Sequence, residues 1–189
     1  MRRFSFLLGG AAALVCSLLS TPARAEGVLD KLGPPHPWLK LDAGFSVADL
    51  RAFSGKRPAP DGTAVGGVFG ADAAIRWERF SVGLRGRFHP LTEFNLWQIA
   101  PYAGIHFPQT NYDLSATAHI GYSVAVERGG NTAAKGLYTG VILAFDYVVK
   151  GPLMLGAGVG SDVLFLGGDP SKSNVGIGVT GTLRLGLLL

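Results

Sequence analysis

The feature that most constrains the fold is a strict alternation of large apolar residues with small or polar ones. Alternation with a period of two residues predicts β-strands that present one apolar face. The apolar positions of the alternating stretches contain no Lys, Arg, Asp or Glu. These stretches lie at about 38–48, 64–78, 80–89, 95–107, 114–127, 137–149, 153–165 and 175–189. The sequence therefore predicts an all-β chain with eight antiparallel strands.

The face opposite the apolar one carries mostly Gly, Ala, Ser and Thr, with scattered charges. A surface in water would carry many more Lys and Glu, whereas small side chains suit a narrow barrel interior. Several stretches are long enough to cross a bilayer when tilted, and aromatic residues gather near their ends on the apolar face. We predict an eight-stranded antiparallel up-and-down transmembrane β-barrel. The alternative is a secreted soluble barrel that buries its apolar face.

Residues 1–25 have the form of a cleaved secretory signal peptide. Arg2 and Arg3 precede an apolar stretch, and Ala23-Arg24-Ala25 provides small residues at a cleavage site. Residues 26–37, which are rich in proline, are predicted to form a periplasmic N-terminal leader. Residues 38–189 are predicted to form the barrel. Beyond the N-terminus there is no run of 18 apolar residues, which argues against a helical membrane protein.

The balance of charges excludes one class of partner. The chain has 17 basic and 13 acidic residues, but three of the basic ones lie in the predicted signal peptide. The 14 basic residues that remain nearly balance the acidic ones, so we expect no nucleic-acid partner. The only cysteine, Cys16, also lies in the signal segment, so we expect no disulfide in the exported chain.

The alternating pattern along residues 38–189 resembles that of the small eight-stranded outer-membrane barrels of the OmpA and OmpX type. The resemblance implies a place in the outer membrane, with both chain ends in the periplasm. It also implies contact with outer-membrane lipid and lipopolysaccharide, and recognition by the outer-membrane assembly machinery. Barrels of this type commonly end in an aromatic residue that the machinery reads, whereas this chain has Leu189 there.

The connections and one proline carry further expectations. The segment 49–62 is long and polar and includes Lys56 and Arg57, so we expect a loop that could contact an envelope partner or lipopolysaccharide phosphates. Pro101 lies inside the fourth stretch and cannot donate a backbone hydrogen bond, which predicts a bulge or bend there.

Charged residues on the face opposite the apolar one are predicted to line the barrel interior. Closure would make the first and eighth strands neighbours and bring Asp42 near Arg184. A buried charge without a partner costs several kcal/mol, so we expect ion pairs that fill most of the interior. The alternative is a narrow gated channel for ions or small solutes. The candidate interior residues are Lys40, Asp42, Asp72, Arg76, Glu78, Arg85, Arg87, Glu127, Asp146, Asp162 and Arg184.

Other motifs for chemistry are weak. The four histidines form no metal-binding motif, and the glycines from Gly156 to Gly160 lack the spacing of a phosphate loop, so we predict no metal and no cofactor. We therefore predict a non-enzymatic structural or partner-binding envelope protein. The third possibility, after the channel, is an enzyme that modifies lipid A, with His89 and Asp169 acting beside Ser171 or Ser173.

Overall fold

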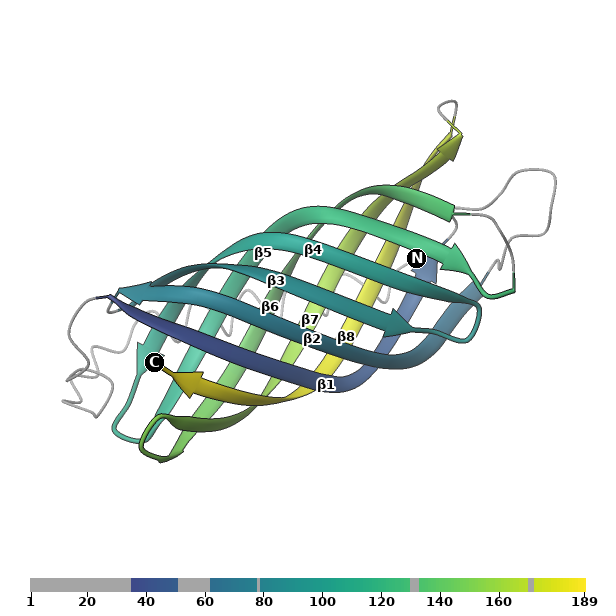
Figure 1. Ribbon diagram of the computed structural model, residues 1–189. Helices are drawn as coiled ribbons and strands as arrows, with labels where there is room; N and C mark the ends of the chain where they lie inside the picture. Colours follow the sequence, from purple (N-terminus) through teal and green to yellow (C-terminus); the bar gives the residue numbers. More distant parts are fainter. Residues whose placement is uncertain (1–34, 51–61, 78, 130–132, 170–171) are drawn as a thin grey trace, which may run out of the picture.

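The computed structural model describes residues 35–50, 62–77, 79–129, 133–169 and 172–189, and these form one closed β-barrel (Figure 1). Each strand pairs antiparallel with its neighbours in sequence, and β1 pairs with β8 to close the barrel. The predicted fold class is confirmed. The strands are β1 (His36–Leu50), β2 (Gly62–Trp77), β3 (Phe80–Pro90), β4 (Phe94–Pro108), β5 (Tyr112–Glu127), β6 (Ala133–Lys150), β7 (Leu153–Asp169) and β8 (Lys172–Leu188).

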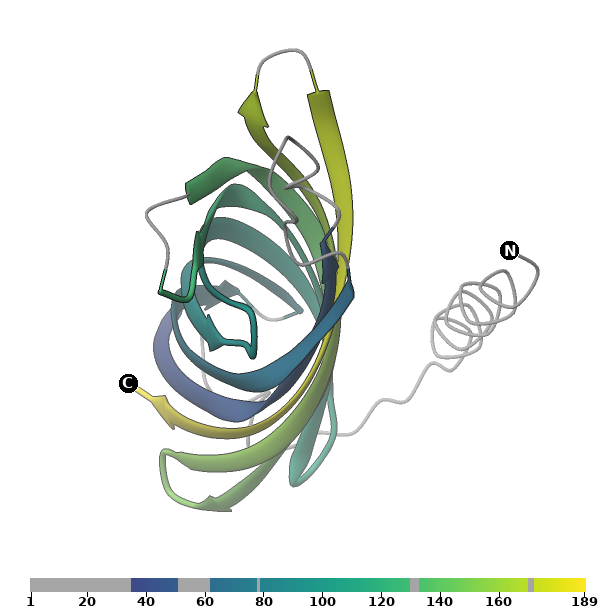
Figure 2. The same ribbon diagram turned by 90° about the vertical axis from the view of Figure 1, so that its right-hand side faces the viewer.

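The two ends of the barrel differ. At one end, which we call the terminus end, β1 begins and β8 finishes. At the other, which we call the loop end, β1 is followed by β2, β3 by β4, β5 by β6 and β7 by β8. The β7–β8 hairpin extends past the rim that the other strands form there, as Figures 1 and 2 show. Within the described residues no helix is long and apolar enough to span a membrane.

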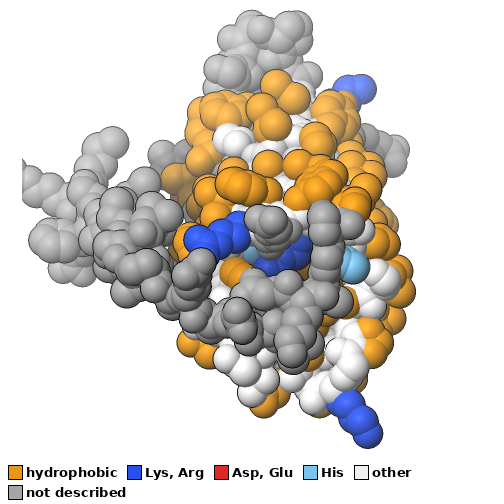
Figure 3. All heavy atoms as spheres, turned by 90° about the vertical axis from the view of Figure 1, so that its left-hand side faces the viewer, with side chains coloured by type: hydrophobic (Ala, Val, Ile, Leu, Met, Phe, Trp, Pro, Cys, Tyr) orange, Lys and Arg blue, Asp and Glu red, His pale blue; other side chains and the backbone are white. Residues whose placement is uncertain are grey.

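The outer wall of the barrel is apolar. Large side chains such as Leu183, Val159 and Phe80 are 74%, 63% and 62% exposed. Figure 3, viewed from the terminus end, shows hydrophobic side chains around the wall. Basic and histidine side chains lie near the centre of this view. Aromatic pairs lie on this wall near both ends, since Phe88 contacts Trp97 toward the loop end and Tyr112 stacks on Phe145 toward the terminus end. This arrangement matches the predicted outward direction of the apolar face.

The expected irregularity at Pro101 takes a different form. The β4–β5 ladder lacks pairs at Ala100 and Pro101, but the register is the same on both sides of the gap. The ladder is therefore interrupted without a bulge, because a proline removes a donor without adding a residue. The register shifts in the described ladders lie elsewhere, between Val148 and Lys150 of β6 and near the loop end of the β7–β8 pair.

Candidate functional site: the barrel interior

The interior of the barrel is lined by charged side chains whose numbers balance. Among the described residues, five basic and five acidic side chains are buried. All ten project from the strand face opposite the apolar wall, where the alternation places them. They are Lys40, Asp42, Asp72, Arg76, Arg85, Arg87, Asp113, Asp146, Asp162 and Arg184.

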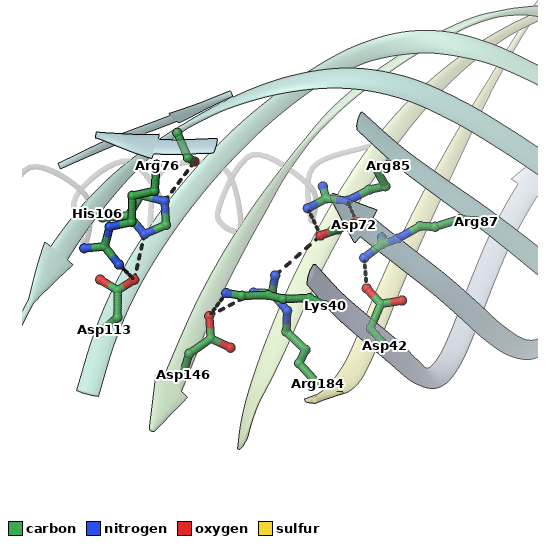
Figure 4. A network of polar contacts seen from close by, with 11 residues as sticks. Lys40, Asp42, Asp72, Arg76, Arg85, Arg87, His106, Asp113, Asp146 and Arg184 are labelled. Atoms are coloured by element: carbon green, nitrogen blue, oxygen red, sulfur yellow. Dashed lines mark hydrogen bonds and ion pairs between the residues drawn. The ribbon is translucent and has the colours of Figure 1, made fainter. Parts of the chain in front are cut away.

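A chain of alternating charges crosses the middle of the interior (Figure 4). Asp72 accepts two hydrogen bonds from Arg85, both of 2.7 Å, in the bidentate geometry that makes such pairs strong. Lys40 donates to Asp146. Arg184 lies between the two carboxylates, with one terminal nitrogen 3.6 Å from Asp72 and the other 3.6 Å from Asp146. The five residues therefore form one connected series of opposite charges.

Asp42 of β1 and Arg184 of β8 are register partners, which agrees with the prediction that they lie near each other. Each of them, however, forms its ion pairs with other residues. Asp42 accepts from Arg87 at 2.7 Å, although Arg87 lies two strands away on β3. The residue between them is Gly70 of β2, and a Cβ there would overlap Asp42 Oδ1. The missing side chain leaves the room in which this pair forms.

The same arrangement occurs at two further places in the interior. Asp146 of β6 and Arg184 of β8 lie on either side of Gly156 in β7. His119 of β5 contacts Asp162 of β7 at 2.8 Å. The residue between that pair is Gly140, where a Cβ would lie 2.7 Å from His119 Nε2. Interior glycines therefore act as spacers that let side chains two strands apart meet.

A second group of polar contacts lies between the ion pairs and the loop end. His89 has both ring nitrogens in hydrogen bonds, Nδ1 with Ser46 Oγ at 2.9 Å and Nε2 with Gln98 Oε1 at 2.8 Å. Gln98 in turn donates to Asp162 at 3.5 Å. The enzymatic alternative joined His89 to a loop serine; in the structure His89 faces inward, is 1% exposed and has Ser46 and Gln98 as the partners of its ring nitrogens. The side chains of the other candidates, Asp169, Ser171 and Ser173, lie outside the described residues.

A third group lies at the terminus end and includes a residue that the sequence reasoning missed. Asp113, the second residue of β5, accepts from Arg76 at 2.9 Å and lies 2.7 Å from His106 Nδ1. The sequence analysis began this strand at Leu114, whereas β5 begins at Tyr112. Asp113 points inward like Ser115, so a predicted strand that began two residues earlier would have included it. Glu78 lies outside the described residues, and Glu127 is half-buried at the end of β5.

The loop end of the interior is filled by apolar side chains, which the sequence reasoning also missed. Leu50, Leu91, Phe94 and Leu164 are all fully buried in one cluster. Leu50 is the last residue of β1, Leu91 and Phe94 flank the β3–β4 turn, and Leu164 lies toward the end of β7. The interior therefore has an apolar layer at the loop end and a polar, charged layer beneath it. Within the described ranges no group of three or more His, Cys, Asp or Glu side chains could hold a metal ion.

Comparison with solved structures relates the fold to known proteins. Neisserial surface protein A (NspA) matches with a TM-score of 0.64 and 16% identity, over 80% of this chain and 96% of that chain. The fold is that of the small outer-membrane barrels. The N-terminal β-barrel domain of OprF from Pseudomonas aeruginosa also matches, with a TM-score of 0.48 and 12% identity, over 80% of this chain and 97% of that one.

A third solved barrel, Ail of Yersinia pestis, was crystallised with the heparin analogue sucrose octasulfate. It matches with a TM-score of 0.44 and 11% identity, over 81% of this chain and 99% of that chain. No family model matches the sequence, and no curated protein matches it by sequence. The match to NspA finds again, in three dimensions, the resemblance to small eight-stranded outer-membrane barrels that was first noted from the alternation.

Proposed function

We propose that this protein is exported by the signal in residues 1–25 and resides in the outer membrane as a closed barrel. In this proposal it acts as a structural or partner-binding anchor and not as a conduit. The observation that carries the proposal is that two different layers fill the interior in series. The ion-paired layer contains five buried basic and five buried acidic side chains, and the apolar layer at the loop end contains fully buried leucines and Phe94.

The two layers would block a solute for different reasons. An ion crossing the polar layer would have to break contacts such as the two 2.7 Å hydrogen bonds between Arg85 and Asp72. An ion crossing the apolar layer would lose its hydration without gaining a polar partner, which costs many kcal/mol in a medium of low dielectric constant. Either layer alone is therefore expected to keep the barrel closed.

This reasoning predicts the outcome of planar-bilayer conductance measurements. Wild-type barrels should be silent, and so should Arg184→Ala, which opens the polar layer, and Phe94→Ala, which opens the apolar layer. The double variant should give discrete conductance steps, because it weakens both layers. Each preparation is first checked for a heat-shifted gel mobility, which shows that the barrel is folded.

The second candidate function is the narrow gated channel. One observation favours it: Arg184 lies 3.6 Å from each of two carboxylates, so its contacts are longer than the 2.7 Å contacts of Arg85 and Arg87. A residue held in this way could exchange partners. Discrete conductance steps from wild-type protein, altered in size or duration by Arg184→Ala, would support the channel. They would overturn the proposal that the barrel is a closed anchor.

The membrane location predicts how stability depends on depth. Val159 lies near the middle of β7 on the outer wall and is 63% exposed, and Val175 lies near the loop end of β8 and is 53% exposed. In a lipid bilayer, Val159→Arg should lower the free energy of unfolding by about 2–4 kcal/mol, and Val175→Arg by at most about 1 kcal/mol. Urea unfolding of vesicle-inserted protein measures both. Equal, small losses would contradict a lipid-facing wall.

The partners proposed for this barrel follow from its surfaces. The exposed apolar wall supports contact with outer-membrane lipid, and the basic residues of the segment 49–62 would suit lipopolysaccharide phosphates or an envelope protein. Assembly machinery of the outer membrane would be needed to insert the strands. The residues 51–61 lie outside the described part of the chain, so this contribution rests on their sequence.

A further inference from the structure

Three polar side chains at the terminus end of the interior form an ordered series of hydrogen bonds. Ser81 Oγ lies 2.8 Å from His106 Nε2, and His106 Nδ1 lies 2.7 Å from Asp113 Oδ2. Ser81 is the second residue of β3, His106 lies near the end of β4 and Asp113 is the second residue of β5, so three adjacent strands supply them at one level. Figure 4 shows His106 and Asp113 in contact there.

We propose that Ser81, His106 and Asp113 form a serine-nucleophile triad that takes the acyl group from small carboxylic esters entering the barrel at its terminus end. This activity goes beyond the anchoring role and does not depend on it. Nucleophile, base and orienting acid are joined in the order and through the atoms that serine acyl transfer requires, and such triads are recognised by geometry and not by fold.

The donor and acceptor groups of the three side chains determine the direction of these hydrogen bonds. An ionised carboxylate can only accept, so His106 Nδ1 must carry the hydrogen that it shares with Asp113. In the neutral ring Nε2 is then free to accept the hydroxyl hydrogen of Ser81, which is the state that a general base needs. Arg76 also donates to Asp113 Oδ2, at 2.9 Å, and thereby helps to hold the carboxylate in its ionised form and in place.

A second serine–histidine pair in the same interior shows what is particular about the triad. Ser46 Oγ contacts His89 Nδ1 at 2.9 Å, but the other nitrogen of His89 faces the neutral amide of Gln98. An amide oxygen stabilises a developing imidazolium much less than a carboxylate does. Ser46 is therefore a matched control, because it is 2% exposed, close to the 1% of Ser81, and has a histidine partner whose other nitrogen contacts no carboxylate.

The surroundings of Ser81 restrict which esters could reach it. Its register partner on β4 is Gly104, where a Cβ would lie 2.8 Å from both Ser81 Oγ and Thr117 Cγ2, so the position of the hydroxyl depends on this glycine. Trp38, which contacts the His106 ring edge-on at 5.1 Å, belongs to an apolar cluster with Met154 that could contact an acyl chain. Because Ser81 is only 1% exposed, a reactive group has to be small to reach it.

The reaction balances without any additional reactant except water. Ser81 Oγ bonds to the ester carbonyl carbon as its proton passes to His106 Nε2. The bond from the carbonyl carbon to the leaving alcohol oxygen then breaks, and the alcohol takes that proton. Water repeats the sequence on the acyl-serine, releasing the acid and restoring the Ser81 hydroxyl, so ester and water become acid and alcohol.

The test uses the refolded full barrel, its fold checked by heat-shifted gel mobility, with p-nitrophenyl acetate as the probe. Intact-mass analysis and peptide mapping should find one acetyl group on Ser81. The adduct should be lost in Ser81→Ala, and its formation should slow by roughly 10²- to 10⁴-fold in His106→Gln. Gly104→Ala should slow it as well, because the added methyl would displace the hydroxyl from His106. Ser46→Ala should label like the wild type.

Trp38→Ala provides an independent measurement, since removal of the indole should widen the approach and speed labelling of Ser81. The proposal is overturned if folded wild-type protein, quenched with acid early in the reaction, carries no acetyl group on Ser81 and releases p-nitrophenolate no faster than Ser81→Ala. It is equally overturned if Ser81→Ala labels as fast as the wild type, or if Ser46→Ala abolishes labelling while Ser81→Ala does not.

Discussion

Replacing Asp72 with leucine is expected to lower the free energy of unfolding by about 3–5 kcal/mol, because removal of one partner leaves a buried charge without compensation. Arg85 would lose both of its 2.7 Å hydrogen bonds to that carboxylate and is itself only 1% exposed. Among the ion pairs of the described residues, Arg184 would keep the one with Asp146, at 3.6 Å. Urea unfolding of protein inserted in phospholipid vesicles, followed by tryptophan fluorescence, measures the loss.

The double variant Asp72→Leu/Arg85→Met is the control for this prediction. It removes one charge of each sign, so the interior stays balanced, and replacing both members of a buried pair with apolar residues is often close to neutral. We therefore expect it to recover most of the stability that the single variant loses. A single variant that loses less than about 1 kcal/mol would show that Arg85 finds another partner, and the ion-paired layer would then contribute little to stability.

The sequence was sufficient to predict the fold and the inward direction of most of the buried charges. Parity alone placed Arg85 and Arg184 inside, because successive residues of a strand point to opposite faces. It could not predict that Asp42 pairs with Arg87 instead of its neighbour Arg184. That choice depends on the tilt and stagger of the closed barrel, which set where a side chain two strands away lies.

Two parts of the interior were missed because the search followed charges within the expected stretches. Asp113 fell just outside a stretch whose boundary was drawn two residues too late. Leu96 and Leu164 have the same inward parity as the charges, but only the charges were read as interior residues. An interior inventory that counts every inward position, apolar ones included, would have found the layer at the loop end.

The interior glycines connect these observations, because they decide which charges can meet. Gly70, Gly140 and Gly156 each stand between two side chains that make contact across an intervening strand. In a sequence such glycines resemble the small residues of any narrow barrel. Their specific role appears only when the register shows which residues flank them. Substitution at a spacer glycine should therefore be costly, whereas the same substitution on the outer wall should not.

Gly156→Val gives the strongest form of this prediction: we expect most of the protein to fail to refold. A Cβ at Gly156 would overlap Asp146 Oδ1 and the backbone carbonyl oxygen of Phe145, and a backbone atom cannot move aside as a flexible side chain can. The matched control is Gly86→Val in β3, where a Cβ has no atom within 4 Å. The fraction with heat-shifted gel mobility after refolding into vesicles measures both.

The two substitutions add the same β-branched side chain to the same kind of secondary structure, so strand propensity cannot account for a difference between them. Gly86→Val should refold like the wild type, since its side chain points outward along with Leu84 and Phe88. Equal refolding of both variants would contradict the spacer role, because it would mean that Asp146 and the β6 backbone can move away from Gly156. Failure of Gly156→Val alone would show that the contacts between Asp146 and Arg184 require a glycine on the strand between them.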